Sequence, residues 1–248
     1  MSLEARRLEE LSLNSSAPPG QLLYDGWLLR LQPGKAKRAR SVNAVYPSSI
    51  ALPEKIAYCE RLYASSGLPA IFRITPFSEP AGLDAELERR GYGTFDHTAV
   101  ECAPLASAPP GGEGAEPLAL SRWVEAVGDL RGSPAEQRAG HYARLEACVL
   151  GMHPLAIVER GAPVATGLAI IEDGCVGLFD IVVHASQRRR GLARRLVSAL
   201  LARAWRDGAR NAYLQVERDN APARSLYATL GFAERYLYWY RGREGERR

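Results

Sequence analysis

Hydrophobic and polar residues are arranged along the second half of the chain in a way that predicts three neighbouring strands. Residues 155–159, 165–171 and 176–183 are rich in Val, Ile, Leu and Ala, and short apolar runs bounded by turn residues are typical of strands. Residues 160–162 separate the first two runs, and residues 172–174 separate the last two. Both connections are short enough for antiparallel hairpins.

A longer apolar pattern then predicts a helix over residues 192–206. Its apolar positions recur at helical spacing and are Leu196, Val197, Leu200, Leu201 and Ala204. Two further helices are expected at residues 121–127 and 135–149, the second with Ser133 as N-cap, Pro134 in its first turn and Glu136 as capping partner. A strand at 212–216 and a helix at 223–230 follow. This order predicts an α/β fold, a mixed sheet with helices on both sides.

The first half of the chain repeats part of this pattern and predicts a second lobe of related α/β topology. Gly67, Phe72 and Gly91 recur as Gly208, Tyr213 and Gly231, which lie 140 or 141 residues later. Pro and Gly are frequent in residues 104–117, which suggests an exposed linker. We therefore predict an N-terminal lobe at 1–103, a linker at 104–117 and a C-terminal domain at 118–248.

The composition of the 248 residues, 46% hydrophobic and 24% charged, is that of a globular protein and excludes a disordered or collagen-like chain. The net charge of +4 is a small excess for this length, so we expect no nucleic-acid partner. Because no apolar run reaches about 18 residues, we expect no membrane span. The four cysteines are far apart and have no histidine at ligand spacing, which predicts a reduced, cytoplasmic protein without a metal site.

The connection between the third strand and the long helix is the segment most suited to chemistry. Arg188, Arg189 and Arg190 precede Gly191, and Ala193 keeps the next turn small. The first amides of a helix lack intrahelical partners and carry partial positive charge, so this end can hold a phosphate or pyrophosphate. The alternative is an ordinary solvated basic turn.

Two motifs in this region resemble those of the GNAT superfamily of acetyl-CoA-dependent N-acetyltransferases. Arg188-x-x-Gly191-x-Ala193 resembles its R/Q-x-x-G-x-G/A motif, and residues 220–232, N-x-x-A-x-x-L-Y-x-x-x-G-F, resemble its second signature. The resemblance covers residues 117–241. The first half is similar to the N-terminal lobe of two-lobed members, but residues 46–53 contain no Arg-x-x-Gly, so we expect that lobe to have lost acetyl-CoA binding.

The resemblance implies that the protein transfers an acetyl group from acetyl-CoA to the amine of a small molecule or peptide. Tyr227 matches the family's general acid, and Asn220 opens its helix as an N-cap that also touches the coenzyme. The remaining residues expected to bind acetyl-CoA are Ile181, Val182 and Val183 through their backbone, and Arg188, Arg189, Arg190, Gly191, Leu192 and Ala193 around the diphosphate.

The general base is left open. Gln215 stands where some relatives carry a glutamate, Glu217 lies on the same face of that strand, and Asp180 interrupts an apolar strand. If Asp180 is buried, we expect its pKa to be raised. A water chain is a third possibility, and His184 is expected to face solvent or a CoA phosphate. Gln215 also favours a different class of function, a non-catalytic acyl-CoA sensor or interaction module.

Overall fold

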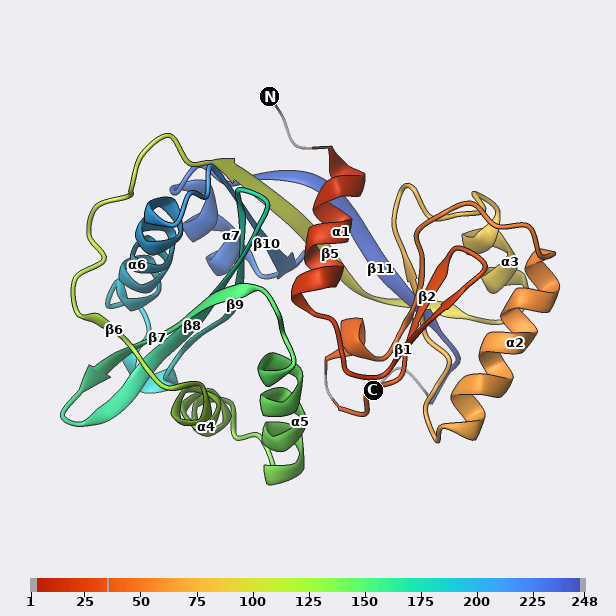
Figure 1. Cartoon of the computed structure of the whole chain (residues 1–248), viewed down its shortest axis with the longest axis horizontal. Coiled ribbons are helices and arrows are strands. Elements are labelled where there is room, and N and C mark those ends of the chain that lie inside the picture. Colours follow the sequence, from red (N-terminus) through yellow and green to blue (C-terminus); the bar gives the residue numbers. More distant parts are fainter. Residues whose placement is uncertain (1–3, 35, 246–248) are drawn as a thin grey trace. The chain divides into compact units, whose positions relative to one another are not determined.

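The structure is a computed structural model that describes residues 4–34 and 36–245. Residues 1–3 and 246–248, the outermost residues of the two predicted lobes, lie outside the described part. The chain divides into two compact units that are described separately (Figure 1). Unit 1 consists of Met1–Ser15, Val100–Val216 and Asn220–Arg235, and unit 2 of Ser16–Ala99, Glu217–Asp219 and Tyr236–Arg248.

Unit 1 is a mixed α/β structure whose strands are ordered β5-β10-β9-β8-β7-β6. The pairs β6–β7, β7–β8 and β8–β9 are antiparallel, whereas β9–β10 is parallel. Its helices are α1 (Ala5–Ser15), α4 (Leu120–Arg131), α5 (Ala135–Glu146), α6 (Leu192–Arg206) and α7 (Ala221–Ala228), with a 3-10 turn η2 (Ala185–Gln187). Its strands are β6 (Ala115–Pro117), β7 (Gly151–Glu159), β8 (Ala162–Glu172), β9 (Cys175–Val183), β10 (Asn211–Glu217) and parts of β5 (Gly93–Pro104) and β11 (Ala233–Gly242).

Unit 2 has the strand order β1-β2-β3-β4-β11. Here β3 and β4 are parallel and the other pairs are antiparallel. The elements are β1 (Gln21–Tyr24), β2 (Trp27–Arg30), β3 (Val42–Ala44), β4 (Phe72–Ile74), α2 (Leu52–Ser65), α3 (Leu83–Arg89), a 3-10 turn η1 (Lys37–Ala39) and the second part of β11. Both units therefore contain a parallel strand–helix–strand segment, β3–α2–β4 and β9–α6–β10, in agreement with the predicted related topologies.

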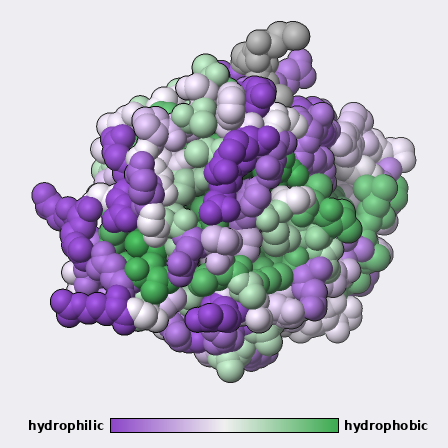
Figure 2. Space-filling view, turned by 60° about the vertical axis from the view of Figure 1, so that its left-hand side comes forward, coloured by the Kyte–Doolittle hydropathy of each residue, from purple (hydrophilic) through white to green (hydrophobic). Residues whose placement is uncertain are grey.

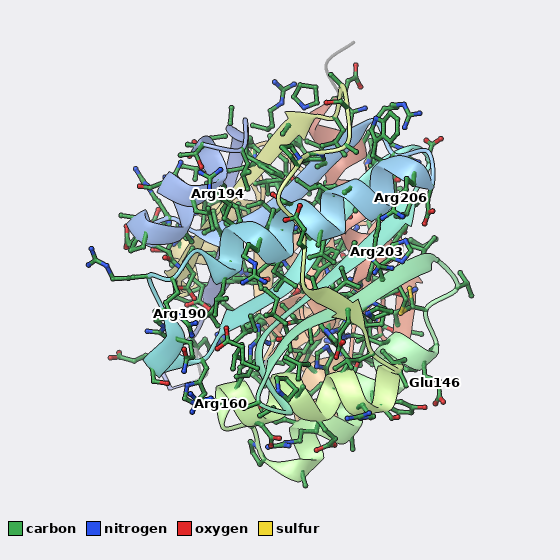
Figure 3. All side chains as sticks on the ribbon, turned by 90° about the vertical axis from the view of Figure 1, so that its left-hand side faces the viewer. Glu146, Arg160, Arg190, Arg194, Arg203 and Arg206 are labelled. Atoms are coloured by element: carbon green, nitrogen blue, oxygen red, sulfur yellow. The ribbon has the colours of Figure 1, made fainter. Side chains whose placement is uncertain are left out.

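The predicted mixed α/β fold is confirmed, and the helices of unit 1 lie on opposite faces of its strands. Leu196 and Leu200 of α6 lie beside Gly167 of β8. The adjacent residue, Leu168, points the other way and packs with Trp123 of α4. The face opposite α6 also carries α5, as the side view in Figure 3 shows.

The segment expected to be a linker, residues 104–117, instead packs within unit 1. Its Gly112 lies so close to α6 that a Cβ atom there would approach the Cα atom of Ala199 to 2.6 Å. Arg195 of α6 donates a hydrogen bond of 2.9 Å to the carbonyl oxygen of Glu113, and β6 then pairs with β7. Small residues thus allow the segment to lie against the helix, although the same residues suggest a flexible linker in the sequence.

The units are also discontinuous in sequence, unlike the three consecutive segments that were predicted. The boundary between them falls inside β5 and inside β11, and residues of α1 belong to unit 1. A single strand can run from one unit into the other without any signal in its sequence, because its side chains alternate between the two faces of the sheet in the same way on both sides of the boundary.

One helix start also differs from the prediction. Ser133 is not the N-cap of α5; Pro134 holds that position without a side-chain cap. The amide of Ser133 instead donates to the carbonyl oxygen of Gly128 at 2.8 Å, next to the left-handed Gly132 that ends α4. The end of α4 uses the residue that the start of α5 was expected to use.

The surface seen in Figure 2 is a mixture of hydrophilic and hydrophobic side chains. The hydrophobic ones form several separate areas between hydrophilic projections, which is ordinary for a folded chain. Within the described residues, no helix is long and apolar enough to cross a membrane.

Candidate functional site

The connection between β9 and α6 presents helix amides that no described side chain caps. After η2, Arg189 and Gly191 adopt left-handed conformations with φ of 64° and 76°. Helix α6 starts at Leu192, and its start has no side-chain cap. A Cβ atom built on Gly191 meets nothing within 4 Å, so the space in front of the helix is open. These features match an anion site built from helix amides and dipole.

The three arginines of this loop do not have equal freedom to meet an anion. Arg190 forms an ion pair with Glu159 at 3.0 Å and also contacts Gln187. Arg188 and Arg189 are exposed and make no ion pair with any described residue. Figure 3 shows Arg190 and Arg194 at the same end of α6, with Arg203 and Arg206 toward the other end. Two of the three predicted phosphate ligands are therefore available, and the third would have to leave Glu159.

The strand that precedes this loop parts from its parallel neighbour before it ends. The register of β9 with β10 ends at the pair Leu178 and Leu214, although β9 continues to Val183. Residues 181–183 are half-buried, and Val182 and Val183 still pair with β8 on the other side. The edge of β9 that faced β10 is thus open over the residues predicted to bind an extended acyl chain.

A β-bulge lies where the two strands part. The register of β8 with β9 shifts between Thr166 and Leu168, which leaves Asp180 and Ile181 opposite Gly167. Asp180 has φ of 50°. A bulge re-aims side chains, and here both Phe179 and Asp180 reach the face that carries α4.

Asp180 does not have the raised pKa expected from the sequence. Burial by itself raises the pKa of this carboxyl, but the hydrogen bond from His141 and the charges of Arg131 and Arg144 outweigh burial and lower it. Arg131 lies 2.6 Å from Oδ1, and His141 Nε2 lies 3.2 Å from Oδ2. Tertiary contacts from α4 and α5 supply these partners, and nothing in the local sequence of β9 indicated them.

Tyr227 lies on α7 with its hydroxyl free of internal partners. Asn220 caps the start of this helix through a 3.2 Å bond from the amide of Ala223, as predicted. The tyrosine is 8% exposed, and its hydroxyl makes no hydrogen bond with a described residue. Burial, with a smaller effect from the charge of Glu101, raises the pKa of Tyr227 to about 12. Such a phenol stays protonated at neutral pH and can serve as an acid.

Glu101 is a residue of this region that the sequence did not single out. It lies on β5 and is 3% exposed. Its Oε1 accepts a 2.8 Å bond from Arg224, one turn before Tyr227 on α7, while its Oε2 has no partner among the described residues. Arg224 also pairs with Glu234 at 2.8 Å. The sequence signal that could have pointed to Glu101 is an acidic residue within the apolar stretch Ala99 to Ala103. This stretch lies far from the two motifs in the sequence.

Substituting Glu101 by Gln is expected to lower the pKa of Tyr227, because the nearby negative charge that disfavours the phenolate is removed. If Tyr227 must be protonated, the alkaline limb of the kcat profile then moves to lower pH. Rates measured from pH 7 to about pH 12, where the wild-type limb is expected, test this. Glu234→Gln is the matched control, since it removes the other partner of Arg224 and should leave the limb in place. An unchanged limb in Glu101→Gln contradicts the prediction.

The other candidate bases and His184 are placed less favourably. Glu217 ends β10 and is exposed. Gln215 donates to the hydroxyl of Ser12 in α1. His184 caps η2 through its contacts with Ser186, which agrees with its expected exposure outside the reacting centre.

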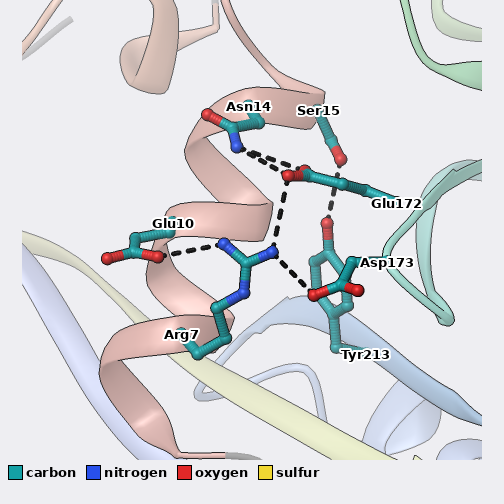
Figure 4. A network of polar contacts seen from close by, with 7 residues as sticks. All are labelled: Arg7, Glu10, Asn14, Ser15, Glu172, Asp173 and Tyr213. Atoms are coloured by element: carbon teal, nitrogen blue, oxygen red, sulfur yellow. Dashed lines mark hydrogen bonds and ion pairs between the residues drawn. The ribbon is translucent and has the colours of Figure 1, made fainter.

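Helix α1 lies against the face of the strands that is opposite α6. The hydroxyl groups of Ser15 and Tyr213 are 3.0 Å apart, which joins α1 to β10. Arg7 bonds Asp173 at 3.0 Å, and Asn14 bonds Glu172 at 2.9 Å, so the helix is also attached to the β8–β9 turn (Figure 4). The N-terminal helix therefore belongs to the surroundings of β9 and β10.

In unit 2, the loop that leads into the corresponding helix, α2, is bound by the protein's own carboxylate. Asp25 in the β1–β2 turn accepts bonds from the amides of Ser49 at 3.0 Å and Ile50 at 2.8 Å, just before α2. Lys55 contacts the same carboxylate at 3.1 Å. Only glycine fits at position 26, because a Cβ atom there would lie 2.4 Å from the carbonyl oxygen of Pro47. An internal anion thus takes the place where unit 1 presents unfilled amides.

The Asp25→Asn variant is expected to unfold at lower temperature than the wild type at pH 7. The amide bonds from Ser49 and Ile50 lower the pKa of Asp25 below its ordinary value. A carboxyl with a lowered folded-state pKa stabilises the fold above its ordinary pKa, near 3.9, and this contribution is lost as the pH falls through the folded pKa. Circular dichroism melts should show the two proteins converging in acid. Equal melting temperatures at pH 7 would contradict this role.

The aromatic residues Tyr236, Tyr238 and Tyr240 of β11 are buried, which fits a core role. No group of three or more potential metal ligands occurs among the described residues.

Comparisons with known proteins agree with this geometry. The acetyltransferase (GNAT) family matches residues 123–232, the span that contains β9, the α6 loop and Tyr227. The uncharacterized N-acetyltransferase YobR of Bacillus subtilis (strain 168) is 30% identical, in a match that covers 96% of this chain and 98% of that protein.

Solved structures show the same fold. A GCN5-related N-acetyltransferase from Kribbella flavida matches with a TM-score of 0.68 and 18% identity, over 98% of this chain and 97% of that chain. A tandem GNAT protein from the clavulanic acid biosynthesis pathway matches with a TM-score of 0.57 and 16% identity, over 81% and 74%. Together with the relative that spans nearly the whole chain, these findings confirm the resemblance read from the two motifs: the chain belongs to the GNAT family of acetyltransferases.

Proposed function

We propose that unit 1 transfers the acetyl group of acetyl-CoA to a primary amine by direct attack on the thioester. The observation that carries the proposal is the uncapped start of α6 beside a strand edge that β10 leaves open. The residues present fit the coenzyme, because the amides after Gly191 and the exposed Arg188 and Arg189 suit a diphosphate. The open edge of residues 181–183 suits the amide groups of a pantetheine arm.

Acetyl-CoA supplies an activated acetyl group on a good leaving thiolate. The backbone amides near the bulge in β9 would bind the carbonyl oxygen and stabilise the negative charge that develops on it. One such donor contributes about 3 kcal/mol in other acyl-transfer sites. In the first turn of α6, Leu192 is buried and Ala193 has a small side chain, so neither blocks the diphosphate. Asn220 caps the start of α7, the helix that carries Tyr227.

Tyr227 would donate its proton to the departing sulfur. The raised pKa of this phenol ensures that the proton is present at neutral pH. General acid catalysis of this kind contributes about 10² to 10⁴-fold. Asp180 and Glu217 are the two carboxylates that the sequence offers as the general base. The lowered pKa of Asp180 makes it a poor proton acceptor by itself.

Two measurements test the function. Isothermal titration should show acetyl-CoA binding, and amine-dependent release of free thiol should occur with a panel containing a polyamine, an aminoglycoside, a peptide with a free N-terminus and a lysine-containing peptide. A protein that binds acetyl-CoA but releases no thiol in a single turnover with any of these amines would instead be a non-catalytic acyl-CoA sensor. Gln215, bound to Ser12 where some relatives have an acid, is the feature that favours that second candidate.

A further inference from the structure

The bulge in β9 brings together two residues that are far apart in sequence. Asp180 lies in the bulge and His141 on α5, and their side chains approach to 3.2 Å between Oδ2 and Nε2. The histidine had no role in the sequence analysis because it is isolated there. In the structure it contacts Asp180, which lies where β9 and β10 part and is one residue before the strand segment proposed to bind acetyl-CoA.

Asp180 is arranged to hold the histidine and not to take a proton itself. Its two oxygens have different partners, Arg131 on Oδ1 at 2.6 Å and His141 on Oδ2. The carboxylate side chain is 14% exposed. The same contacts keep the carboxyl ionised, in agreement with its lowered pKa. An ionised, partly buried carboxylate of this kind fixes which nitrogen of a neighbouring imidazole carries the proton.

The ring of His141 is also held from a second side. Trp123 of α4, which is fully buried, contacts it edge to face with ring centroids 5.8 Å apart. The histidine side chain remains 16% exposed. Nε2 lies 3.2 Å from Asp180 Oδ2 as an ion-pair contact without the alignment of a hydrogen bond, and the other nitrogen, Nδ1, has no partner among the described residues. The charged groups around the pair are Asp180 from β9, Arg131 from α4 and Arg144 from α5.

We infer that His141 is the general base of the reaction and that Asp180 is its positioning residue, an inference that rests on the proposed acetyl transfer. His141 Nδ1 accepts a proton from the acceptor's ammonium group and passes it to solvent. The nitrogen lone pair then forms the C–N bond while the C–S bond breaks. Tyr227 gives its proton to the sulfur, and the second proton lost from the amine restores the phenol. One proton is released in all, which balances the step.

The test compares His141→Asn with the wild type, with amine-dependent thiol release as the readout. At pH 7 an alkylamine is protonated, so kcat/KM should fall about 10² to 10⁴-fold in the variant. At pH 10 a large part of the amine is already neutral, so the loss should shrink at least about tenfold. Acetyl-CoA affinity, measured by titration, should remain unchanged. Asp180→Asn should show the same pH-dependent loss, since it removes the charge that orients and supports the imidazole.

The chain offers a matched control in a second histidine–aspartate pair. His153 Nε2 lies 2.5 Å from Asp207 Oδ2, the C-cap of α6 at the end opposite the Gly191 loop, and His153→Asn should leave the kinetics unchanged. A loss in His141→Asn that is equal at pH 7 and pH 10 would show a purely structural role and overturn the inference. Wild-type activity in a folded His141→Asn variant would overturn it as well. If the wild type binds acetyl-CoA but turns over no amine of the panel, the proposed function itself fails.

Discussion

Replacing Tyr227 by Phe is expected to reduce kcat about 10² to 10⁴-fold, because the sulfur then leaves without a proton from the protein. The KM for acetyl-CoA should change little, since the lost hydroxyl acts in the transition state and not in binding. Thermal stability should also change little, because that hydroxyl has no hydrogen-bond partner among the described residues. Steady-state kinetics with the best amine of the panel, together with melting curves, measure all three quantities.

The control for this variant is Tyr92→Phe in unit 2. Tyr92 is 1% exposed, and its hydroxyl bonds Glu60 at 2.8 Å, so the change removes another buried phenolic group, in the unit that does not carry the proposed chemistry. Its kcat should match the wild type. If Tyr227→Phe retains kcat within about twofold of the wild type, the residue packs beside the site without acting as the acid.

Replacing Gly191 by Glu is expected to weaken acetyl-CoA binding at least about 100-fold, which corresponds to about 2.7 kcal/mol. Two effects act together. Gly191 has φ of 76°, a conformation that costs a residue with a Cβ atom about 1–2 kcal/mol. The added carboxylate would also lie in front of the α6 amides, where it would compete with and repel a diphosphate. Titration with acetyl-CoA measures the change.

Two controls separate these effects. Gly191→Ala adds the backbone strain without the charge, and it should bind acetyl-CoA more tightly than the glutamate variant. Gly208→Glu places the same charge just beyond the other end of α6, at a glycine that also has positive φ, 94°, and open space. Its affinity should equal that of the wild type. Undiminished binding by Gly191→Glu would place the coenzyme elsewhere.

Much of the fold of unit 1 could be predicted because its signals are local. The helix predicted at 192–206 has the bounds of α6, and the predicted strands correspond to β7, β8, β9 and β10. Apolar periodicity and turn residues act within one element, so they are readable from its own sequence. The Asn220 cap is of the same kind. Ser133 shows the limit of such local signals. It lies between the end of α4 and the start of α5, and the sequence does not say which of the two helix ends it caps.

The sequence by itself was enough to predict the family and to single out the Gly191 loop and Tyr227 as candidates, because each signal depends on a short run of residues. Only the tertiary structure decided the partners of these groups. It brought Glu101 from β5 to the helix of Tyr227, His141 and Arg131 to Asp180, and Asp25 to the start of α2. Electrostatic effects fall with distance in space and not along the chain. The protonation states at the site therefore follow from packing that no local pattern records.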